Sequence, residues 1–356
     1  MPEPALSRPL SGSARAIEQG VARWLSERDE SDTVVVRTSG STGTPKDVLL
    51  SAGALRWSAT ASLERLGGHG SWILALPAHY VAGLQVIVRS VLAGVSPVVL
   101  AEHADLPAAA SRLASGSRRY LAAVPTQLYR WMSTPADLDA LRSLDAVLVG
   151  GAAAGKQLLG RAHSAGIKVV TTYGMSETCG GCVYDGVALD GVEVALAGSG
   201  AIRLKGRMLF LGYAGDPELT ASTLRDGWLQ TTDLGRFDSE GRLEVVGRAD
   251  DVVQSGGVNI SLTAVERRIA CMETVEQCVV LAEADPEWGA RLVADVVPRN
   301  HDEDPDLASM RDGVAEVLPR SWAPQEMVIV QRLPMLESGK IDRRSLQLRR
   351  ATTSAS

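Results

Sequence analysis

Short apolar runs alternate with longer amphipathic segments over residues 33–170. The runs are rich in β-branched residues and have the length of buried strands, whereas the segments between them repeat apolar residues at helical spacing. The expected strands are 33–36, 72–76, 97–100, 120–123, 145–149 and 167–170. The expected helices are 52–66, 82–93, 107–115, 126–132 and 154–165. This alternation predicts a layered α/β domain.

The pattern changes twice further along the chain. Residues 190–247 are richer in glycine and in short alternating runs, which predicts a β-rich subdomain. After residue 250 the expected elements are a helix at 261–271, strands near 277–281 and 291–297, and a helix at 306–318. The sequence therefore predicts an α/β protein with a large N-terminal domain, 1–248, and a small α+β C-terminal domain, 249–356. We expect the start, residues 1–16, and the tail after Arg344 to be loose.

Composition indicates a compartment and argues against some partners. The chain has 356 residues, of which 45% are apolar, and a mean hydropathy of +0.04. The 36 basic and 42 acidic residues give a net charge of −6, which argues against a nucleic-acid partner. No apolar run approaches the roughly 18 residues of a membrane span. Four cysteines and the lack of an apolar signal core predict a reducing, cytoplasmic location.

Residues 38–47 are the most informative segment. They read Thr-Ser-Gly-Ser-Thr-Gly-Thr-Pro-Lys-Asp and directly follow an apolar run. Glycines let backbone N–H groups turn inward, hydroxyls donate hydrogen bonds and Lys46 adds positive charge, so the loop suits a polyphosphate. The spacing is not that of a Walker loop. The alternative interpretation is a flexible Ser/Gly surface turn.

Two other patterns are weaker. Residues 150–157 nearly match a Walker loop, but Gln157 stands where a hydroxyl is needed, and a helix start with a solvated Lys156 is the simpler interpretation. Cys179 and Cys182 have C-x-x-C spacing, yet no second pair follows at zinc-finger spacing. Small buried thiols are therefore favoured over a metal or redox site.

Later segments carry side chains that suit a nucleotide. Tyr173 offers a flat face for a base, and Glu177 offers a carboxylate oxygen for Mg²⁺. Asp233 is a carboxylate, which can accept hydrogen bonds from two hydroxyl groups at once, and Lys340 carries a positive charge near the end of the chain. Each residue also has an ordinary structural interpretation: a core tyrosine, a helix-start carboxylate, a turn aspartate and a solvated lysine.

Five elements in this order resemble the adenylate-forming superfamily, which includes acyl-CoA synthetases, peptide-synthetase adenylation domains and luciferases. They are residues 38–47, 171–178, 227–235, 247–260 and 333–343, so the resemblance covers nearly the whole chain. The resemblance implies a mobile C-terminal lid and a two-step reaction. The implied ligands are ATP, Mg²⁺, coenzyme A and a small carboxylic acid.

The resemblance also implies residue roles. Nucleotide binding falls to Ser39, Gly40, Ser41, Thr42, Gly43, Thr44, Lys46, Gly151, Ala152, Ala153, Thr172, Tyr173, Gly174, Met175, Ser176, Asp233 and Arg248. Catalysis falls to Thr38, Glu177, Arg248 and Lys340, and Mg²⁺ binding to Thr42 and Glu177. The carboxylic acid is expected to bind at His79, Gly150, Gly174 and Ser176. Gly256 and Gly257 are expected to line the path by which the coenzyme A thiol enters, and Asp250 to be the hinge between the two domains.

A narrower resemblance follows Glu177. The run Thr178–Gly186 and the early position of the phosphate loop resemble the o-succinylbenzoate–CoA ligases of actinobacterial menaquinone synthesis. That resemblance implies carboxylate adenylation, then thioester formation with release of AMP and pyrophosphate. The chain departs from the superfamily at Thr232, Gln254 and Asn259, and part of the usual first subdomain is missing.

Two alternatives stay open at this point. One is another aryl or acyl acid–CoA ligase, and the other is an adenylate-binding protein without full turnover. The residues that hold a second carboxylate and the oligomeric state, a homodimer included, are also open.

Overall fold

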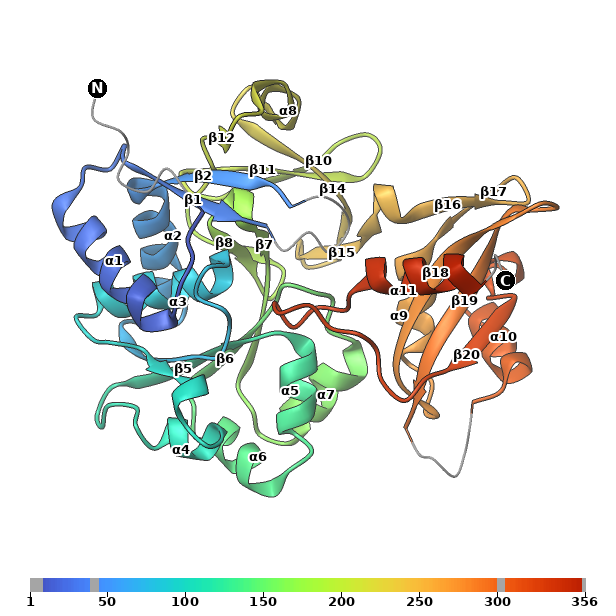
Figure 1. Cartoon of the computed structure of the whole chain (residues 1–356), viewed down its shortest axis with the longest axis horizontal. Coiled ribbons are helices and arrows are strands. Elements are labelled where there is room, and N and C mark those ends of the chain that lie inside the picture. The colour runs from blue at the N-terminus through green and yellow to red at the C-terminus, as the bar shows by residue number, and fades with distance from the viewer. Residues whose placement is uncertain (1–8, 39–44, 300–304, 354–356) are drawn as a thin grey trace.

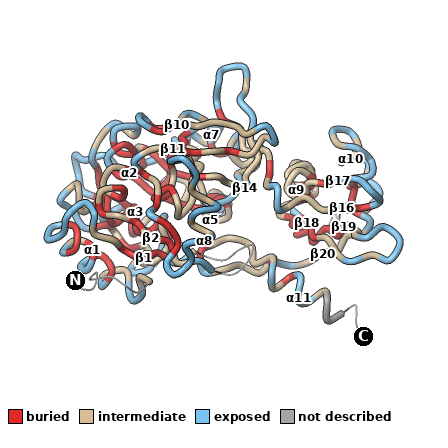
Figure 2. The backbone as a smooth tube through the Cα atoms, turned by 90° about the horizontal axis from the view of Figure 1, so that it is seen from above, coloured by how far each residue is buried: buried red, intermediate tan, exposed pale blue. Residues whose placement is uncertain are grey.

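The structure, a computed structural model, describes residues 9–38, 45–299 and 305–353. Separate hydrophobic clusters divide this chain into a large N-terminal part and a small C-terminal part, which lie side by side (Figure 1). Figure 2 shows the buried stretches gathered inside each part. The predicted α/β class, with a large and a small part, is confirmed.

A seven-stranded sheet forms the centre of the large part. Its spatial order is β4 (Val98–Val99), β3 (Gly70–Leu74), β5 (Arg118–Ala123), β6 (Ala146–Val149), β7 (Val169–Met175), β8 (Gly180–Tyr184) and β9 (Val187–Ala188). The strands from β4 to β7 pair in parallel, and β8 and β9 turn back antiparallel. The loops after parallel strands therefore meet at one edge of the sheet, where α/β proteins bind ligands.

Helices cover both faces of this sheet. The helices are α1 (Ala14–Glu27), α2 (Ala52–Arg65), α3 (Val81–Leu92), α4 (Leu106–Ala110), α5 (Pro125–Trp131), α6 (Pro135–Arg142) and α7 (Lys156–Ser164), and η1 (Leu100–Glu102) is a short 3₁₀ turn. Residues from α1 to α3 pack with Trp72 and Leu148, and residues from α4 to α7 pack with Ile73 and Val147. Neighbouring strand residues face opposite sides, so β3 and β6 contribute to both clusters.

Two further sheets complete the large part. One contains β1 (Thr33–Arg37), β2 (Asp47–Ser51) and β12 (Gly212–Tyr213). The other contains β10 (Glu193–Leu196), β11 (Ala201–Lys205), β14 (Trp228–Phe237), β13 (Leu224–Arg225) and β15 (Leu243–Arg248), with α8 (Pro217–Thr223) nearby. The β-rich region predicted at 190–247 is confirmed, and the antiparallel β1–β2 pair has the phosphate-loop segment as its connection.

The small part is built on one antiparallel hairpin. Its strands are β18 (Val275–Asp285), β19 (Gly289–Pro298) and β20 (Glu326–Ile329), with the separate pair β16 (Val252–Ser255) and β17 (Val258–Ser261). The helices α9 (Leu262–Ile269) and α10 (Leu307–Ala315) pack on one face, and α11 (Arg343–Thr353) packs on the other. The 3₁₀ turns η3 (Ala249–Asp251) and η4 (Arg320–Trp322) lie in the connections.

Both expectations of loose ends are wrong for the residues described. After Arg344 the chain continues in α11, where Leu346 is buried and Arg350 pairs with the buried Asp295. Near the start, Ser13 caps α1 by accepting a hydrogen bond from the backbone of Ala16, so the helix begins inside the expected arm. Short apolar repeats flanked by arginine and serine hid both helices from pattern analysis.

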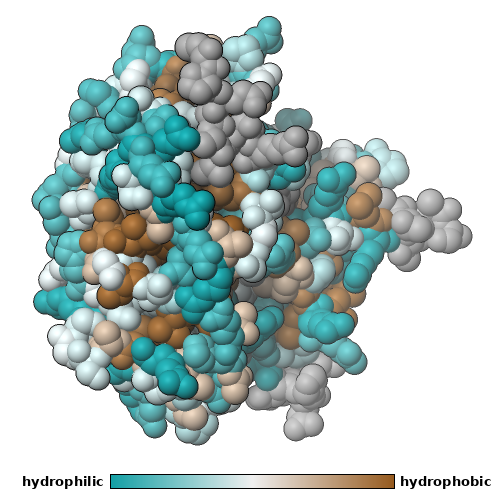
Figure 3. All heavy atoms as spheres, turned by 60° about the vertical axis from the view of Figure 1, so that its left-hand side comes forward, coloured by the Kyte–Doolittle hydropathy of each residue, from teal (hydrophilic) through white to brown (hydrophobic). Residues whose placement is uncertain are grey.

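The surface mixes apolar and polar residues. On the face shown in Figure 3, apolar patches are separated by hydrophilic side chains, as on most folded proteins. No helix in the described ranges combines the length and the apolar character needed to cross a bilayer.

Candidate active site

The base of the predicted phosphate loop is closed by two reciprocal hydrogen bonds. The backbone N–H of Thr38 donates to the carbonyl oxygen of Lys46 at 2.8 Å, and the Lys46 N–H donates to Thr38 Oγ1 at 2.9 Å. The Arg37–Asp47 ion pair, at 2.7 Å, supports the same junction. Six predicted ligands lie outside the described residues: Ser39, Gly40, Ser41, Thr42, Gly43 and Thr44.

Tyr213 joins this loop to the predicted metal ligand. The Lys46 ammonium lies 5.1 Å from the centre of the Tyr213 ring, and the Tyr213 hydroxyl donates to Glu177 Oε1 at 2.8 Å. Glu177 lies in η2 (Ser176–Thr178), immediately after β7. The sequence analysis did not identify Tyr213, although the Gly212-Tyr213 pair before a proline-started helix was a usable signal. The structure therefore places Lys46 over the Tyr213 ring and Glu177 at its hydroxyl group.

Steric limits shape the segment that leads to Glu177. A Cβ added at Gly174 would lie 2.0 Å from the carbonyl oxygen of Gly180, and one added at Gly150 would lie 2.2 Å from Thr172 Oγ1. Both positions therefore require glycine. The predicted ligands Thr172, Met175 and Ser176 are half-buried along this hairpin, and Ala152 and Ala153 are exposed in the loop after β6.

Asp233 is the centre of a polar network between the two parts. Tyr173 donates its hydroxyl hydrogen to Asp233 Oδ2 at 2.8 Å, and Arg248 Nη1 lies 3.3 Å from Asp233 Oδ1. Burial raises the pKa of Asp233, while Tyr173 and Arg248 oppose that rise. The Tyr173 ring is consequently fixed by its hydroxyl, with its pKa raised by burial and by Asp233.

Arg248 also binds the predicted hinge. Its guanidinium donates to both carboxylate oxygens of Asp250, at 2.8 and 2.7 Å, and this pairing lowers the pKa of Asp250. Arg248 Nη2 donates to Thr232 Oγ1 at 2.9 Å as well. The threonine that departs from the superfamily pattern thus contacts the arginine shared by Asp233 and Asp250. Two carboxylates and one guanidinium link the predicted ribose site to the hinge segment.

Lys340 reaches from the small part into the large part. Its loop is held by Thr126, which donates to the carbonyl oxygen of Gly339 at 2.9 Å. A Cβ added at Gly151 would lie 3.4 Å from Lys340 Cε, so the lysine lies against the predicted adenine segment. Burial and the Arg248 charge lower the pKa of Lys340, whereas Asp233 and Glu177 raise it. The half-buried lysine therefore lies against the large part, where the charges of Arg248, Asp233 and Glu177 act on it.

His79 lies close to the loop that carries Lys340. Its Nε2 atom lies 3.7 Å from Glu337 Oε2, and its ring centre lies 4.3 Å from that of Tyr80. His79 follows β3 at the sheet edge where Gly150 follows β6. Of the predicted acid-binding residues, His79 thus lies beside the loop that carries Lys340.

Arg89 is a buried charge that the sequence analysis missed. It lies on α3, is 3% exposed, and no described carboxylate forms an ion pair with it. Its Nη2 atom donates to the Tyr184 hydroxyl at 3.3 Å, its guanidinium lies 5.0 Å from the Trp72 ring centre, and its Nε has no partner among the described residues. Burial lowers its pKa, yet an arginine stays charged at neutral pH. An arginine within the apolar run 86–92 was the available signal.

Arg89 lies beneath the hairpin that carries the nucleotide residues. Tyr184, on β8, pairs with Thr172 on β7. One helical turn nearer the start of α3, Gln85 is also buried, and its Oε1 has no partner among the described residues. Buried polar atoms without partners are rare, and each requires an explanation, such as a functional role.

The predicted thiol-path glycines lie elsewhere. Gly256 donates its N–H to the carbonyl oxygen of Trp288 at 2.8 Å, and Gly257 follows in the same β16–β17 turn. This turn packs on the β18–β19 turn within the small part, away from the Lys340 loop in Figure 1. In this arrangement the structure does not bring Gly256 and Gly257 to the site. Asp250, the predicted hinge, lies in η3 between the two parts.

The metal-binding options are limited within the described ranges. No group of three or more His, Cys, Asp or Glu side chains is placed there to hold a metal ion. Cys179 and Cys182 are buried, with pKa values raised by burial, which fits packed thiols. Glu177 alone still suits Mg²⁺ that arrives with a triphosphate, because Mg²⁺ commonly takes one or two carboxylates and several phosphate oxygens or waters.

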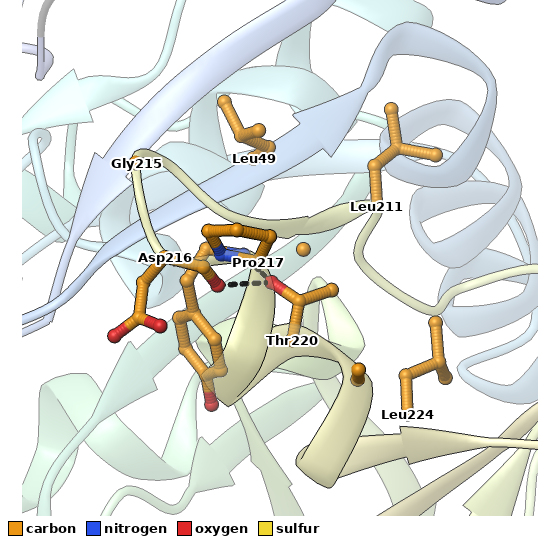
Figure 4. Close-up of a pocket in the computed structure, with 10 residues that line it drawn as sticks. Leu49, Leu211, Gly215, Asp216, Pro217, Thr220 and Leu224 are labelled. Atoms are coloured by element: carbon orange, nitrogen blue, oxygen red, sulfur yellow. Dashed lines mark hydrogen bonds between the residues drawn. The ribbon is translucent and has the colours of Figure 1, made fainter.

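A shallow apolar hollow lies behind the phosphate-loop base (Figure 4). It shares Tyr213 with the network above but contains none of Lys340, Asp233 or Arg248. Its lining residues are Leu49, Leu211, Gly212, Tyr213, Gly215, Asp216, Pro217, Thr220, Ala221 and Leu224. The charged cluster, rather than this hollow, is the candidate active site.

The arrangement can stabilise transfer of charge between anions. Arg248 pairs with Asp233 at 3.3 Å, and the charges of Arg248, Asp233 and Glu177 act on the Lys340 ammonium. A carboxylate at this position suits ribose hydroxyls, and an ammonium suits charge that builds on a phosphate.

Comparisons with known proteins point in the same direction. The pattern of the AMP-binding enzyme family matches residues 8–213, and that of the AMP-binding enzyme C-terminal domain matches residues 264–340. A probable 2-succinylbenzoate–CoA ligase of Mycobacterium tuberculosis is 43% identical, over 96% of this chain and 93% of that protein. An indoleacetate–CoA ligase of Aromatoleum aromaticum is 30% identical, over 86% of this chain and 65% of that protein.

A solved structure shares the fold. It is the o-succinylbenzoate CoA synthetase of Bacillus subtilis in complex with its acyl-adenylate intermediate. The TM-score is 0.74 with 26% identity, over 88% of this chain and 68% of that protein.

Proposed function

The chain belongs to the AMP-binding enzyme family, and on that premise we propose that it is an ATP-dependent ligase that joins o-succinylbenzoate to coenzyme A. The similarity to the mycobacterial ligase over nearly the whole of both proteins supports this proposal. ATP, Mg²⁺ and coenzyme A are the required co-substrates, and the products are the thioester, AMP and pyrophosphate.

The first half-reaction forms an acyl adenylate. A carboxylate oxygen of the acid attacks the α-phosphorus of ATP, the bond from that phosphorus to the bridging oxygen breaks, and pyrophosphate leaves. The loop that begins at Thr38 and ends at Lys46 binds the triphosphate, and Asp233 accepts hydrogen bonds from the ribose hydroxyls. Glu177 would supply a carboxylate ligand to Mg²⁺. Lys340 stabilises the charge that develops on the phosphates, an interaction stronger in the transition state than in the ground state.

The second half-reaction forms the thioester. The coenzyme A sulfur, having lost its proton, attacks the acyl carbon, and the bond to the AMP oxygen breaks. Lys340 is not needed for this step. The small part must instead turn about Asp250, which withdraws Lys340 and brings the turn of Gly256 and Gly257 toward the acyl group. The division of the chain near residue 248 is the domain boundary that this motion requires.

The observation that supports o-succinylbenzoate as the substrate is the buried positive charge of Arg89. o-Succinylbenzoate has two carboxylates, and only one of them is activated. The second would enter a site that disfavours an isolated anion unless a cation is present. Arg89 is such a cation: it lies beneath the β7–β8 hairpin with no carboxylate partner among the described residues and with an unpaired Nε atom. A guanidinium is also suited to bind a carboxylate with two hydrogen bonds.

A second candidate is a ligase for a monocarboxylic aromatic acid. The likeness to an indoleacetate–CoA ligase supports it. Such an acid would leave Arg89 buried and unpaired, which is costly, so the diacid is favoured.

Thioester formation with ATP, Mg²⁺ and coenzyme A tests the proposal. The acids compared are o-succinylbenzoate, benzoate, succinate and a medium-chain fatty acid. We expect kcat/KM to be highest for o-succinylbenzoate, by at least about tenfold, because one charged hydrogen bond contributes about 1.5–3 kcal/mol. A higher value for any monoacid would contradict the proposed substrate, and binding without thioester formation would contradict the proposed reaction.

A further inference from the structure

Gln157 links the two parts of the molecule away from the reacting groups. It is an exposed residue in the first turn of α7, and its Nε2 atom donates a hydrogen bond to the carbonyl oxygen of Cys271 at 2.6 Å. Cys271 follows α9 in the small part. Cys271 is the residue after the C-cap Ala270, so this bond fixes the segment that directly follows the last turn of α9.

The same helix contacts the large part near the hinge. Arg267, on α9, donates to the carbonyl oxygen of Val245 at 2.7 Å. The lysine loop makes a third contact, where Thr126 holds Gly339. The Gln157–Cys271 bond lies outside both of these regions. Because its two residues belong to different parts, any turn of the small part about Asp250 changes their separation.

We propose that Gln157 is a positioning residue for the first half-reaction: its amide holds the end of α9 and thereby favours the orientation in which Lys340 is inserted. This inference rests on the proposed two-step function. The near-Walker segment 150–157 thus ends not in a phosphate ligand but in a contact between the parts. Gln157 touches no substrate in this role and acts only through the placement of Lys340.

The expected effect has a definite sign. Removing a bond made only in the Lys340-inserted orientation shifts the equilibrium toward the other orientation. One neutral hydrogen bond corresponds to a shift of roughly 2- to 12-fold. If the inserted orientation dominates, the thioester step from supplied adenylate speeds up; if it does not, adenylation slows. In both cases the ratio of the thioester rate to the adenylation rate rises by that factor.

The test compares full-length Gln157→Ala with Gln19→Ala, which alters an exposed glutamine on α1. Single-turnover adenylation and thioester formation from supplied acyl adenylate are measured separately. We expect the rate ratio to rise roughly 2- to 12-fold in Gln157→Ala and to stay unchanged in Gln19→Ala. Gln157→Lys should restore the original ratio, because an ammonium can donate to the same carbonyl. A purely structural role would lower both rates together; an unchanged ratio would overturn the inference.

A second measurement does not depend on activity. Cys179, Cys182 and Cys278 are buried, whereas Cys271 is half-buried at the contact itself. If the inserted orientation dominates in the ligand-free protein, alkylation of Cys271 should be about 2- to 12-fold faster in Gln157→Ala, matching the equilibrium shift; if it does not, the alkylation rate should change little while adenylation slows. Faster alkylation together with no turnover of any acid would support the contact and defeat the proposed function. Unchanged alkylation together with unchanged adenylation would count against the contact.

Discussion

Replacing Arg89 with methionine separates a structural role from a substrate-binding role. Methionine keeps most of the length and apolar volume of the side chain but removes its charge. In the free protein the change loses the Trp72 contact, about 1 kcal/mol, and a long hydrogen bond to Tyr184, about 1 kcal/mol. It also removes the desolvation cost of an isolated guanidinium, which is several kcal/mol. We therefore expect the free energy of unfolding to stay the same or to rise by about 1–3 kcal/mol.

The effect on activity should have the opposite sign. With methionine at position 89, the second carboxylate of o-succinylbenzoate would be buried without a cation. Breaking a buried charge pair by removing one partner costs about 3–5 kcal/mol. Because about 1.4 kcal/mol corresponds to tenfold, kcat/KM should fall by about 100- to 4,000-fold. An acid without the second carboxylate should react as well as before or better.

Two assays decide the matter. Urea unfolding gives the free energy of unfolding, and coupled pyrophosphate release gives kcat/KM for o-succinylbenzoate and for benzoate. Arg89→Lys serves as the control, since it retains the charge but loses the forked guanidinium. Its kcat/KM for o-succinylbenzoate should lie between those of the unaltered protein and Arg89→Met. If Arg89→Met lowers stability and reduces activity equally on both acids, the arginine is structural and the reasoning fails.

The remaining predictions concern the mechanism. Lys340→Ala should abolish most adenylation and spare thioester formation from supplied adenylate, as single-turnover assays would show; an equal loss in both steps would contradict the assigned role. Asp250→Pro should impair the thioester step more than adenylation, because proline fixes one backbone angle at the hinge, whereas adenylation loses only the carboxylate that pairs with Arg248; unchanged thioester formation would argue against a moving small part. Burial lowers the pKa of Lys340 and raises that of Asp233. Adenylation needs the ammonium and the carboxylate, so its rate should decline on the alkaline side at a lower pH than for an ordinary lysine, and on the acid side at a higher pH than for an ordinary aspartate. Lys340→Arg should remove the alkaline decline and keep the acid one, as a pH profile would reveal.

Local sequence predicted the elements that local physics controls. The apolar run before residue 38 forms β1, and the helix expected at 52–66 is α2, which Ser51 caps. The terminal helices α1 and α11 were missed because their sequences are rich in charged or small residues and the helices are held by tertiary packing. Helical stability in proteins comes mostly from such packing.

For the candidate site, the sequence predicted where the residues lie on the chain but not how they pair. Residue order alone located Lys46, Glu177, Asp233 and Lys340 on the chain, since loops that bind anions and nucleotides need glycine, hydroxyl and charge at fixed spacing. Their roles stay predictions. The structure adds that the predicted hinge Asp250 shares Arg248 with Asp233, a pairing that spacing does not specify.

The sequence by itself determined the class of fold, the order of its elements and the family, because these follow from short-range pattern and from residues set close together. Only the tertiary structure decided that Arg89 is buried with no acidic partner among the described residues, that Tyr213 contacts both Lys46 and Glu177, and that Gln157 meets the end of α9. Burial and pairing depend on neighbours brought together from distant parts of the chain. Their free energies depend on how far each polar or charged group is removed from water when those parts meet.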